Sequence, residues 1–395
     1  MAGERLDDKR TDWAASPVVA AVRCSSYDEV EVAAAVGRGI DLLGGIERFA
    51  EPRETILLKP NLLVPRDAVR AVTTHPSVFR AVARRFIDAG ARVTYGDSPG
   101  FGGPAFVARR TGIAAIAEQL GIELADFTSG RDVPYPEGLL IKRFTIARGA
   151  VAADGIVSLP KLKTHGLTRI TGAIKNQYGC IPGTLKAEFH ARLPNVDLFS
   201  RMLVDLNRLL RPRLFVMDGV VAMEGNGPQN GSPRPMNVLL LSNDPVALDA
   251  TVCEIIGLDP SLVLPIVYGN ESGLGRASDI EWMGDPIETL AANDFDVNRR
   301  PSSTTGGPGR TSRLARRFVV PRPVIRPERC TLCGTCVAVC PATPKAVRFD
   351  GVNRSRPPVH RYDACIRCYC CQEMCPEGAI ELRVPLLGRA IHRRT

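Results

Sequence analysis

Two short runs of cysteine constrain this chain more than any other feature of its sequence. Eight of the twelve cysteines follow one spacing, C-x2-C-x2-C-x3-C-Pro, in two copies. The first copy consists of Cys330, Cys333, Cys336 and Cys340, and the second of Cys365, Cys368, Cys371 and Cys375. Such runs bind [4Fe–4S] clusters, and in two-cluster domains the fourth cysteine of each run binds the other cluster. The sequence therefore predicts two [4Fe–4S] clusters and a small α+β, ferredoxin-like domain around them.

The same pattern predicts which thiolates share a cluster. One set is Cys330, Cys333, Cys336 and Cys375, and the other is Cys340, Cys365, Cys368 and Cys371. Disulfides and zinc are the alternatives. Disulfides suit small secreted domains, and structural zinc usually takes two well-separated cysteine pairs instead of triplets. We therefore expect iron–sulfur clusters, with Cys370 as an extra cysteine that packs and does not bind.

The length and composition indicate a globular protein of two or three folded units. The chain has 395 residues, of which 45% are hydrophobic and 24% charged. No run of about eighteen apolar residues is present, and Glu4, Asp7 and Asp8 precede the first apolar stretch. These features argue against a spanning helix and against a signal peptide. We therefore expect a cytoplasmic protein.

The net charge of +9 is concentrated in one segment. Residues 297–327 hold eight arginines and no acid, and they are rich in Pro, Gly, Ser and Thr. We interpret them as a linker between residues 1–296 and a ferredoxin-type domain of residues 328–384. A contact with an acidic redox partner, nucleic acid or anionic lipid is the alternative to a solvated tether. Because aromatic residues are nearly absent, we expect no nucleic acid, and we assign only a weak peripheral membrane contact to the basic tail 385–395.

Residues 1–296 alternate apolar strand candidates with helices of period 3.6. This pattern predicts βαβ units and a mainly parallel, doubly wound α/β sheet. Strands are predicted over residues 55–59, 92–95, 122–125, 155–159, 214–217 and 238–241. Helices are predicted to begin at Pro76 and to run over 105–120, from the cap Asn195 to Pro212, and from Asn243 to Gly257. The apolar runs 139–141 and 144–146 predict a hairpin appended to the sheet.

Polar side chains follow most of these strands. Ligands of open parallel sheets bind beyond the carboxyl ends of the strands, so a small anionic substrate is expected there. We assign its binding to Lys59, Asn61, Lys161, Lys163, Lys175, Asn176 and Asp218. Proton transfer is assigned to His165, Asp97 and Glu224. Taken singly, each residue is more commonly structural, for example as a turn former or a solvated loop lysine.

Two common nucleotide and hydrolase motifs are missing from this region. The glycine-rich segment 96–103 lacks the Gly-Lys-Ser/Thr of a P-loop and does not match Gly-x-Gly-x-x-Gly after a strand. No Gly-x-Ser-x-Gly elbow is present. Nucleotide binding and a hydrolase triad therefore have no support in the sequence.

The rim segments resemble a known family. They read LKPNL at 58–62, THP at 74–76, GDS at 96–98, LPKLKTH at 159–165, GAIKN at 172–176 and MDG at 217–219. Over roughly residues 55 to 260 the chain resembles the DUF362 family, a domain of unknown function that is often fused to a ferredoxin-type 2[4Fe–4S] module. The resemblance implies an iron–sulfur cluster-binding protein, and it implies no catalytic residue.

Two functional hypotheses follow. The first is an iron–sulfur oxidoreductase that takes electrons from a redox partner protein and passes them to a small anionic substrate or cofactor in the α/β domain. The alternative is a non-enzymatic electron carrier or assembly subunit, in which the α/β domain is a protein-docking module. Binding of a small anion distinguishes the two. A redox-sensing regulator that binds nucleic acid through the arginine-rich segment ranks last, because the chain lacks a recognition motif.

Overall fold

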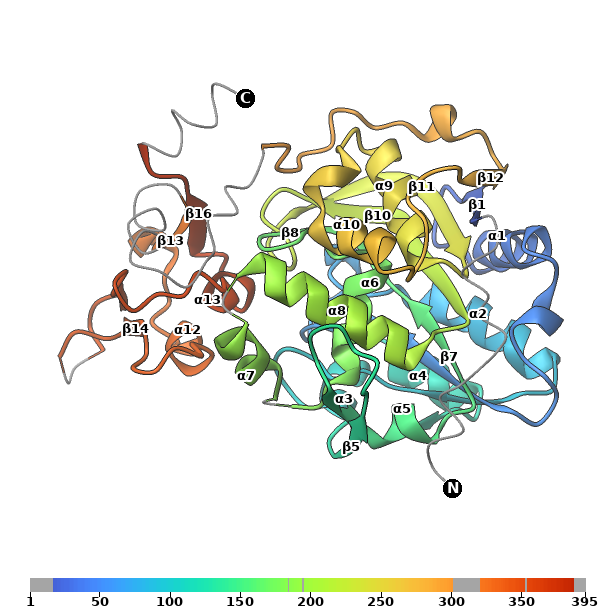
Figure 1. The fold of residues 1–395 in the computed structure, drawn as a ribbon, viewed down its shortest axis with the longest axis horizontal. Coiled ribbons are helices and arrows are strands. Elements are labelled where there is room, and N and C mark those ends of the chain that lie inside the picture. The colour runs from blue at the N-terminus through green and yellow to red at the C-terminus, as the bar shows by residue number, and fades with distance from the viewer. Residues whose placement is uncertain (1–16, 184, 194, 301–319, 352–353, 387–395) are drawn as a thin grey trace.

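The protein folds into a large α/β unit and a small unit that carries both cysteine runs (Figure 1). The computed structural model describes residues 17–183, 185–193, 195–300, 320–351 and 354–386. Most of the predicted linker and of the predicted tail therefore lies outside the described residues. Within them, no helix has both the length and the apolar character needed to cross a membrane.

The large unit is built on a ten-stranded sheet. Its main path runs β12 (Glu281–Gly284), β1 (Val18–Arg23), β11 (Ser232–Ser242), β10 (Leu214–Glu224), β7 (Gly155–Leu159), β2 (Thr55–Pro60), β3 (Arg92–Tyr95) and β4 (Glu123–Leu124). Two further strands, β8 (Lys161–His165) and β9 (Arg169–Ile170), extend from β10. The pairs from β10 through β4 are parallel, and β11 is antiparallel to both of its neighbours. The mainly parallel α/β sheet is therefore confirmed.

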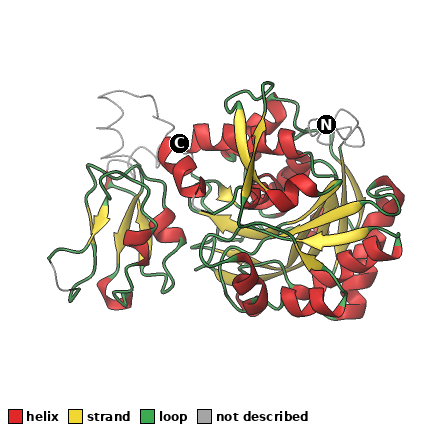
Figure 2. Cartoon of the chain, turned by 90° about the horizontal axis from the view of Figure 1, so that it is seen from below, coloured by secondary structure: helices red, strands yellow, loops and turns green. Residues whose placement is uncertain are grey.

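Helices cover both faces of this sheet, as Figure 2 shows for the larger unit. One face carries α1 (Glu29–Leu42), α2 (Pro76–Asp88), α3 (Pro104–Arg110) and α4 (Ile113–Gln119). The other carries α6 (Gly172–Asn176), α8 (Val196–Leu210), α9 (Pro245–Ile255) and α10 (Leu264–Glu271). Leu57 belongs to one core, and its neighbours Ile56 and Leu58 belong to the other. Successive strand residues face opposite sides, so alternate residues of β2 supply two cores.

Local chemistry explains where the main helices begin. The Asn195 side chain accepts a hydrogen bond of 2.8 Å from the backbone N–H of Leu198 and so caps α8, as predicted. Asp244 caps α9 in the same way, accepting from Val246 and Ala247. Proline at the first position of α2 and α9 leaves no unused N–H there.

Two predicted elements are wrong in detail. The helix expected over 105–120 is divided into α3 and α4, because Gly112 takes a φ of 82° that an α-helix cannot contain. The hairpin exists, but β6 (Arg143–Ala147) pairs with β5 (Gly130–Pro134) and not with residues 139–141. The backbone N–H groups of 139–141 instead donate to the carboxylate of Asp205, at 2.7 to 2.8 Å, and so have no need of a strand partner.

The remaining elements of the described residues are short. They are α5 (Arg148–Ala152), α7 (Leu185–Arg192), α12 (Thr335–Ala338), α13 (Cys370–Glu373), β13 (Arg322–Ile325), β14 (Val347–Arg348), β15 (Val359–His360) and β16 (Ile380–Arg383). In the small unit, β13 pairs with β16 and β14 with β15, both antiparallel. β13 lies within the segment expected as linker, so ordered structure of the small unit begins before residue 328.

Candidate functional site

The fold brings thiols from the two cysteine runs into two mixed groups. A small cavity of the small unit is lined by Cys330, Cys333, Cys336 and Cys375, which are three cysteines of the first run and the last of the second. The second group surrounds Cys371. Burial and then the neighbouring Cys368, Cys365, Cys336 and Cys340 raise the pKa of the Cys371 thiol well above its ordinary value. The first group has the composition of one predicted set, and the second combines Cys340, Cys365 and Cys368 of the other predicted set with Cys336 of the first.

These thiols suit clusters better than single ions. Within the described part of the chain, no three His, Cys, Asp or Glu side chains gather closely enough to hold one metal ion. A [4Fe–4S] cluster does not need such a gathering, because each cysteine binds a different iron. The cavity of the small unit is lined by four thiols, the number that one cluster requires. Cys370 is buried, and the neighbouring Cys368 together with burial raises the pKa of its thiol well above the ordinary value.

The helix α13, which carries Cys370 and Cys371, packs on the carboxyl ends of the large sheet. Gln372 Nε2 donates to Asn226 Oδ1 at 2.6 Å and to the carbonyl of Gly227 at 3.2 Å. Gln229 Nε2 donates to the carbonyl oxygens of Glu373 at 2.5 Å and Cys375 at 3.1 Å. The two units therefore meet through hydrogen bonds that involve the second cysteine run.

An apolar contact supports this docking. Met374, directly before Cys375, is 8% exposed and joins a buried cluster of the large unit. The other buried members of that cluster are Val64, Ala71, Val72 and Met223. Met374 thus anchors the second run in an apolar pocket of the α/β unit.

The lysines predicted to bind an anion lie beneath this contact and are enclosed. Lys161 Nζ is 2.7 Å from Asp218 Oδ2 and donates to the Tyr27 hydroxyl at 2.7 Å. That hydroxyl donates to Asp218 Oδ1 at 2.8 Å, and the His75 backbone N–H donates to Oδ2 at 2.9 Å. Both oxygens of this buried carboxylate are therefore engaged, and Asp218 serves as the counter-ion of Lys161.

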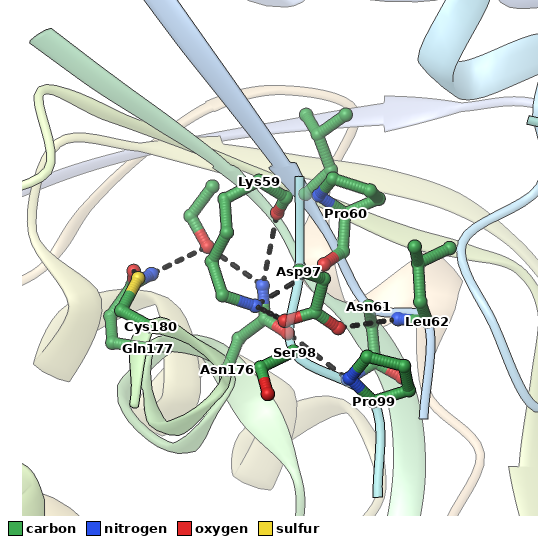
Figure 3. Close-up of polar contacts among 12 residues, drawn as sticks. Lys59, Pro60, Asn61, Leu62, Asp97, Ser98, Pro99, Asn176, Gln177 and Cys180 are labelled. Carbon is green, nitrogen blue, oxygen red and sulfur yellow. Dashed lines mark hydrogen bonds and ion pairs between the residues drawn. The ribbon is translucent and has the colours of Figure 1, made fainter. Parts of the chain in front are cut away.

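A second buried ion pair joins the ends of β2 and β3 (Figure 3). Lys59 Nζ lies 2.7 Å from Asp97 Oδ1, and Asp97 Oδ2 accepts from the Leu62 backbone N–H at 2.8 Å. The chain at Gly179 passes so close that a Cβ there would lie 1.8 Å from Asp97 Oδ1. Glycine is required at that point because any side chain would displace the carboxylate.

Amide side chains link the carboxyl ends of β2 and β7 to β8. Asn61 Nδ2 donates to Asn176 Oδ1 at 3.0 Å, and Asn176 Nδ2 donates to Ser158 Oγ at 2.9 Å. Lys163 Nζ donates to Asn61 Oδ1 at 2.8 Å and to the Val72 carbonyl at 2.6 Å, with no carboxylate at hydrogen-bond distance among the described residues. Burial lowers the pKa of Lys163 well below its ordinary value. We call Lys59, Asn61, Asp97, Lys161, Lys163, Asn176 and Asp218 the rim network.

The rim network differs from the expected open crevice. Lys161, Lys163 and His165 belong to β8 and not to a loop, and their alternation places all three on one side of the strand. Lys161 and Lys163 are each 1% exposed, and Lys59 is fully buried. Burying a lysine costs free energy unless its charge is matched, and the network supplies the matching groups. The structure therefore gives these residues partners within the protein.

His165, the last residue of β8, lies next to the rim network and faces the small unit. Its Nδ1 accepts from the backbone N–H groups of Leu167 and Thr168, at 3.0 and 3.2 Å, so the ring proton is placed on Nε2. Nε2 lies 2.9 Å from Glu373 Oε1 of α13. Burial lowers the pKa of His165, whereas burial is outweighed at Glu373, whose pKa falls to about 2 beside His165 and Lys175.

Lys175 lies near His165 and Glu373, whereas Lys186 and Glu224 contact other groups. Lys175 has no hydrogen-bond partner among the described residues, and burial lowers its pKa. Lys186 Nζ donates to Ser98 Oγ at 2.7 Å and to the Pro99 carbonyl at 2.8 Å. Glu224 lies at the end of β10, where it accepts from the Asp296 backbone N–H at 3.0 Å and is 3.9 Å from Arg234. The structure does not bring Glu224 to the rim network.

A cavity of about 1360 Å³ lies where the two units meet. His165, Gly166 and Asn226 line it from the large unit, and Arg367 and Gln372 from the small one. Its lining includes seven arginines, which are Arg66, Arg70, Arg110, Arg169, Arg300, Arg329 and Arg367. Four carboxylates oppose them, which are Asp67, Asp197, Glu377 and Glu381. The excess of cations makes this interdomain cavity the part of the described structure best suited to an anion.

Sequence reasoning missed most of these cavity residues. Arg66, Arg70 and Arg110 stand in loops and helix ends without a motif, so no local signal marks them. Arg367 had a signal, because it occupies the position between Cys365 and Cys368 at which the first run has the apolar residue Leu332. A charged residue within a cluster loop is a difference that an alignment of the two runs exposes.

An α/β unit whose strand ends are covered by a two-run iron–sulfur domain defines the class of protein. Residues 56–254 match the family described as "Domain of unknown function (DUF362)", and residues 322–381 match the "4Fe-4S dicluster domain". A Synechocystis protein named "Thylakoid-associated protein sll1697" is 34% identical over 278 residues, which are 70% of this chain and 86% of that protein. The chain therefore belongs to the DUF362 family and carries a C-terminal 4Fe-4S dicluster domain.

One solved structure has a distant likeness to the chain. It is the lactate racemase apoprotein from Thermoanaerobacterium thermosaccharolyticum, at 13% identity and a TM-score of 0.38. The match covers 60% of this chain and 56% of that one, so this chain spans just over half of that structure. A likeness this weak says nothing about activity.

Proposed function

We propose that this protein is an iron–sulfur oxidoreductase that passes electrons to a small anionic substrate or cofactor at the boundary of its two units. Two [4Fe–4S] clusters would be held by the thiol sets Cys330, Cys333, Cys336, Cys375 and Cys340, Cys365, Cys368, Cys371. When bound, such clusters supply one-electron chemistry at a potential set by their protein surroundings. The docking of α13 on the strand ends, with Glu373 Oε1 2.9 Å from His165 Nε2, is the observation that carries this proposal.

The interdomain cavity, and not the rim network, is the ligand site that we propose. A ligand would have to displace Asp218 from Lys161 or Asp97 from Lys59 to use the rim lysines, at the cost of stranding a buried carboxylate. The cavity needs no such exchange. It is reached from the rim by His165 and from α13 by Gln372, so a ligand there touches both units.

The residues of the chain have separable roles in this proposal. The cavity arginines of the large unit attract and orient the anion, and His165 holds its Nε2 proton toward Glu373 beside the cavity. The rim network holds the carboxyl ends of β2, β7 and β10 together beneath the docking site. Asp97 and Glu224, which were predicted to move protons, are assigned structural roles because each is bound to groups outside the cavity.

A non-enzymatic electron carrier is the second candidate. The burial of Lys161 and Lys163 favours the electron-carrier hypothesis, because it leaves the predicted anion-binding lysines inaccessible to a ligand. An α/β unit without an accessible binding site would serve as a docking module. A redox partner protein is required in either case, and the exposed Cys333 side of the small unit is where we propose that it approaches. A cytoplasmic location is also a proposal, and peripheral membrane contact is the alternative that the name of the Synechocystis relative suggests.

A matched pair of arginines tests the ligand site. Arg109 and Arg110 are adjacent exposed residues of α3, and only Arg110 lines the cavity. The full chain is purified anaerobically, and small molecules released on denaturation are identified by mass spectrometry. An anion is expected to co-purify with wild type and with Arg109→Gln, and to be retained about tenfold less by Arg70→Gln/Arg110→Gln, which removes two charges. Equal retention by all three would reject the cavity, and the absence of any anion would leave the carrier ahead.

A further inference from the structure

Arg367 is a buried cation for which the described residues offer no partner. It lies between Cys365 and Cys368 and is 5% exposed. Its Nε and Nη1 atoms are both buried and have no hydrogen-bond acceptor in the described structure. Its guanidinium carbon is 5.1 Å from the centre of the Tyr362 ring, which is the contact that the structure gives it. A guanidinium enclosed in this way is costly unless an anion lies beside it.

The group expected beside Arg367 is itself anionic. Cys365 and Cys368 precede and follow Arg367 closely in the chain, and they belong to one proposed thiolate set with Cys371 and Cys340. A [4Fe–4S] cluster held by four thiolates carries net negative charge, and its sulfur atoms accept hydrogen bonds. The buried N–H groups of Arg367 are thus enclosed where acceptors of that chemistry are expected. The fit of Arg367 to such a group does not depend on a ligand in the cavity.

The first cysteine run provides a built-in comparison. The loops have the same backbone, with φ of 60° at Leu332 and 62° at Arg367, and of 77° at Gly334 and 63° at Tyr369. At the position of Arg367 the first run therefore has an uncharged leucine. Near the first run, Arg326 and Arg329 share the carboxylate of Glu381, at 2.6 and 3.5 Å, and Arg354 beside Gly334 is exposed.

Other charges near the second run offset each other. Glu373 carries a carboxylate, and among the nearby charges it stabilises the Lys175 cation most strongly. His165, the other neighbour of Glu373, has its pKa lowered by burial. Arg367 also has no carboxylate partner among the described residues, and unlike Lys163 it has buried N–H groups without any hydrogen-bond acceptor.

We propose that Arg367 donates hydrogen bonds to the sulfur atoms of the cluster held by the second run, and that its charge raises the reduction potential of that cluster above that of the first. Added positive charge and hydrogen bonds to sulfur both favour the reduced, more negative state. At equilibrium, a single electron then resides mainly on the cluster held by the second run. This is the run that docks on the α/β unit, whereas Cys333 of the first run is exposed. Arg367 is a positioning and tuning residue in this proposal, which rests on the cluster content of the proposed function and not on its substrate.

The test is a redox titration of the anaerobically purified full chain, followed by electron paramagnetic resonance. Iron and sulfide are measured first, so that a protein without two clusters fails the proposed function before this inference is reached. Arg367→Gln is expected to move the distribution of one electron at least tenfold toward the first run, which corresponds to about 59 mV. Arg367→Lys is expected to shift it less. Leu332→Gln is the matched control at the first run and is expected to leave the potential of the second unchanged.

Each other outcome is decisive. Unchanged midpoint potentials in Arg367→Gln with both clusters intact would overturn the proposal. If Arg367→Gln loses the second cluster, Arg367→Lys decides, since retention with an intermediate potential supports the role of charge and loss in both variants overturns it. If the higher potential of the second cluster appears in wild type only when inorganic phosphate is added, Arg367 belongs to an anion site of the cavity. That result would also overturn the proposal.

Discussion

The two cysteine runs have the same spacing and the same loop backbone, yet they face different surroundings. Cys333 of the first run is exposed, whereas Cys371 of the second is buried and its helix α13 packs on the α/β unit. The second run also carries Arg367 and Met374, which meet the interdomain cavity and an apolar cluster of the large unit. Spacing therefore determines which groups a run can hold, and the surface beneath a run determines what those groups can reach.

The largest expected effect comes from removing a single thiol of the second run. Wild-type protein is expected to contain about eight irons and eight sulfides per chain, and Cys371→Ser to lose or convert one cluster, because a serine oxygen replaces a proposed ligand. Cys370→Ser is the neighbouring control and is expected to keep both clusters. Iron and sulfide analysis with electron paramagnetic resonance measures this. Stoichiometric zinc in the wild-type protein, or only one cluster, would contradict the prediction that each cysteine run holds a [4Fe–4S] cluster.

Next in size is the effect of breaking the buried ion pair of Lys161 and Asp218 in the α/β unit. Lys161→Met leaves Asp218 without its counter-ion in a fully buried site, and is expected to lower the free energy of unfolding by about 3–5 kcal/mol. Arg85→Met is the control, since its ion pair with Asp41 is at the surface and is worth about 0–1 kcal/mol. Denaturant unfolding of protein with verified iron content measures both.

The double variant separates framework from ligand site. Lys161→Met/Asp218→Leu removes both charges and is expected to recover part of the lost stability, because no buried ion is left unpaired. If Lys161→Met unfolds no more easily than wild type but releases a bound anion, Lys161 is a binding residue and the rim network is a ligand site after all.

The smallest of the three effects concerns acid. His190 of α7 is buried, stacks on Phe199 at 4.7 Å, and has its pKa lowered by burial to about 4. The unfolded chain takes up this proton near pH 6.5 and the folded chain does not, so stability is lost as pH falls from 6.5 toward 4. At pH 5 the loss is roughly 2 kcal/mol.

The variant His190→Phe keeps the ring contact and removes the proton uptake. Its free energy of unfolding is expected to fall less between pH 7 and pH 5 than that of wild type, in denaturant titrations with iron content verified at each pH. Parallel pH profiles for the two proteins would show that His190 is not held neutral and that this side of the α/β unit is wetter than its burial indicates.

The sequence alone determined the features that depend on residues close together in the chain. Cysteine spacing predicted the 4Fe-4S domain, and Asn195 marked the start of a helix. The alternation of apolar strand segments with helices of period 3.6 predicted the mainly parallel α/β sheet. Motif segments such as 159–165 indicated the family. These signals are local, so they survive in the sequence without knowledge of the fold.

Only the tertiary structure decided how those parts meet. Lys161 and its counter-ion Asp218 are separated by 57 residues, and His165 meets Glu373 from a different unit. A lysine at a strand end looks the same in sequence whether it faces solvent, a ligand or a buried carboxylate, because its free energy depends on which charge the fold places beside it. The closed rim network, the docked second run and the unmatched Arg367 are therefore products of long-range packing.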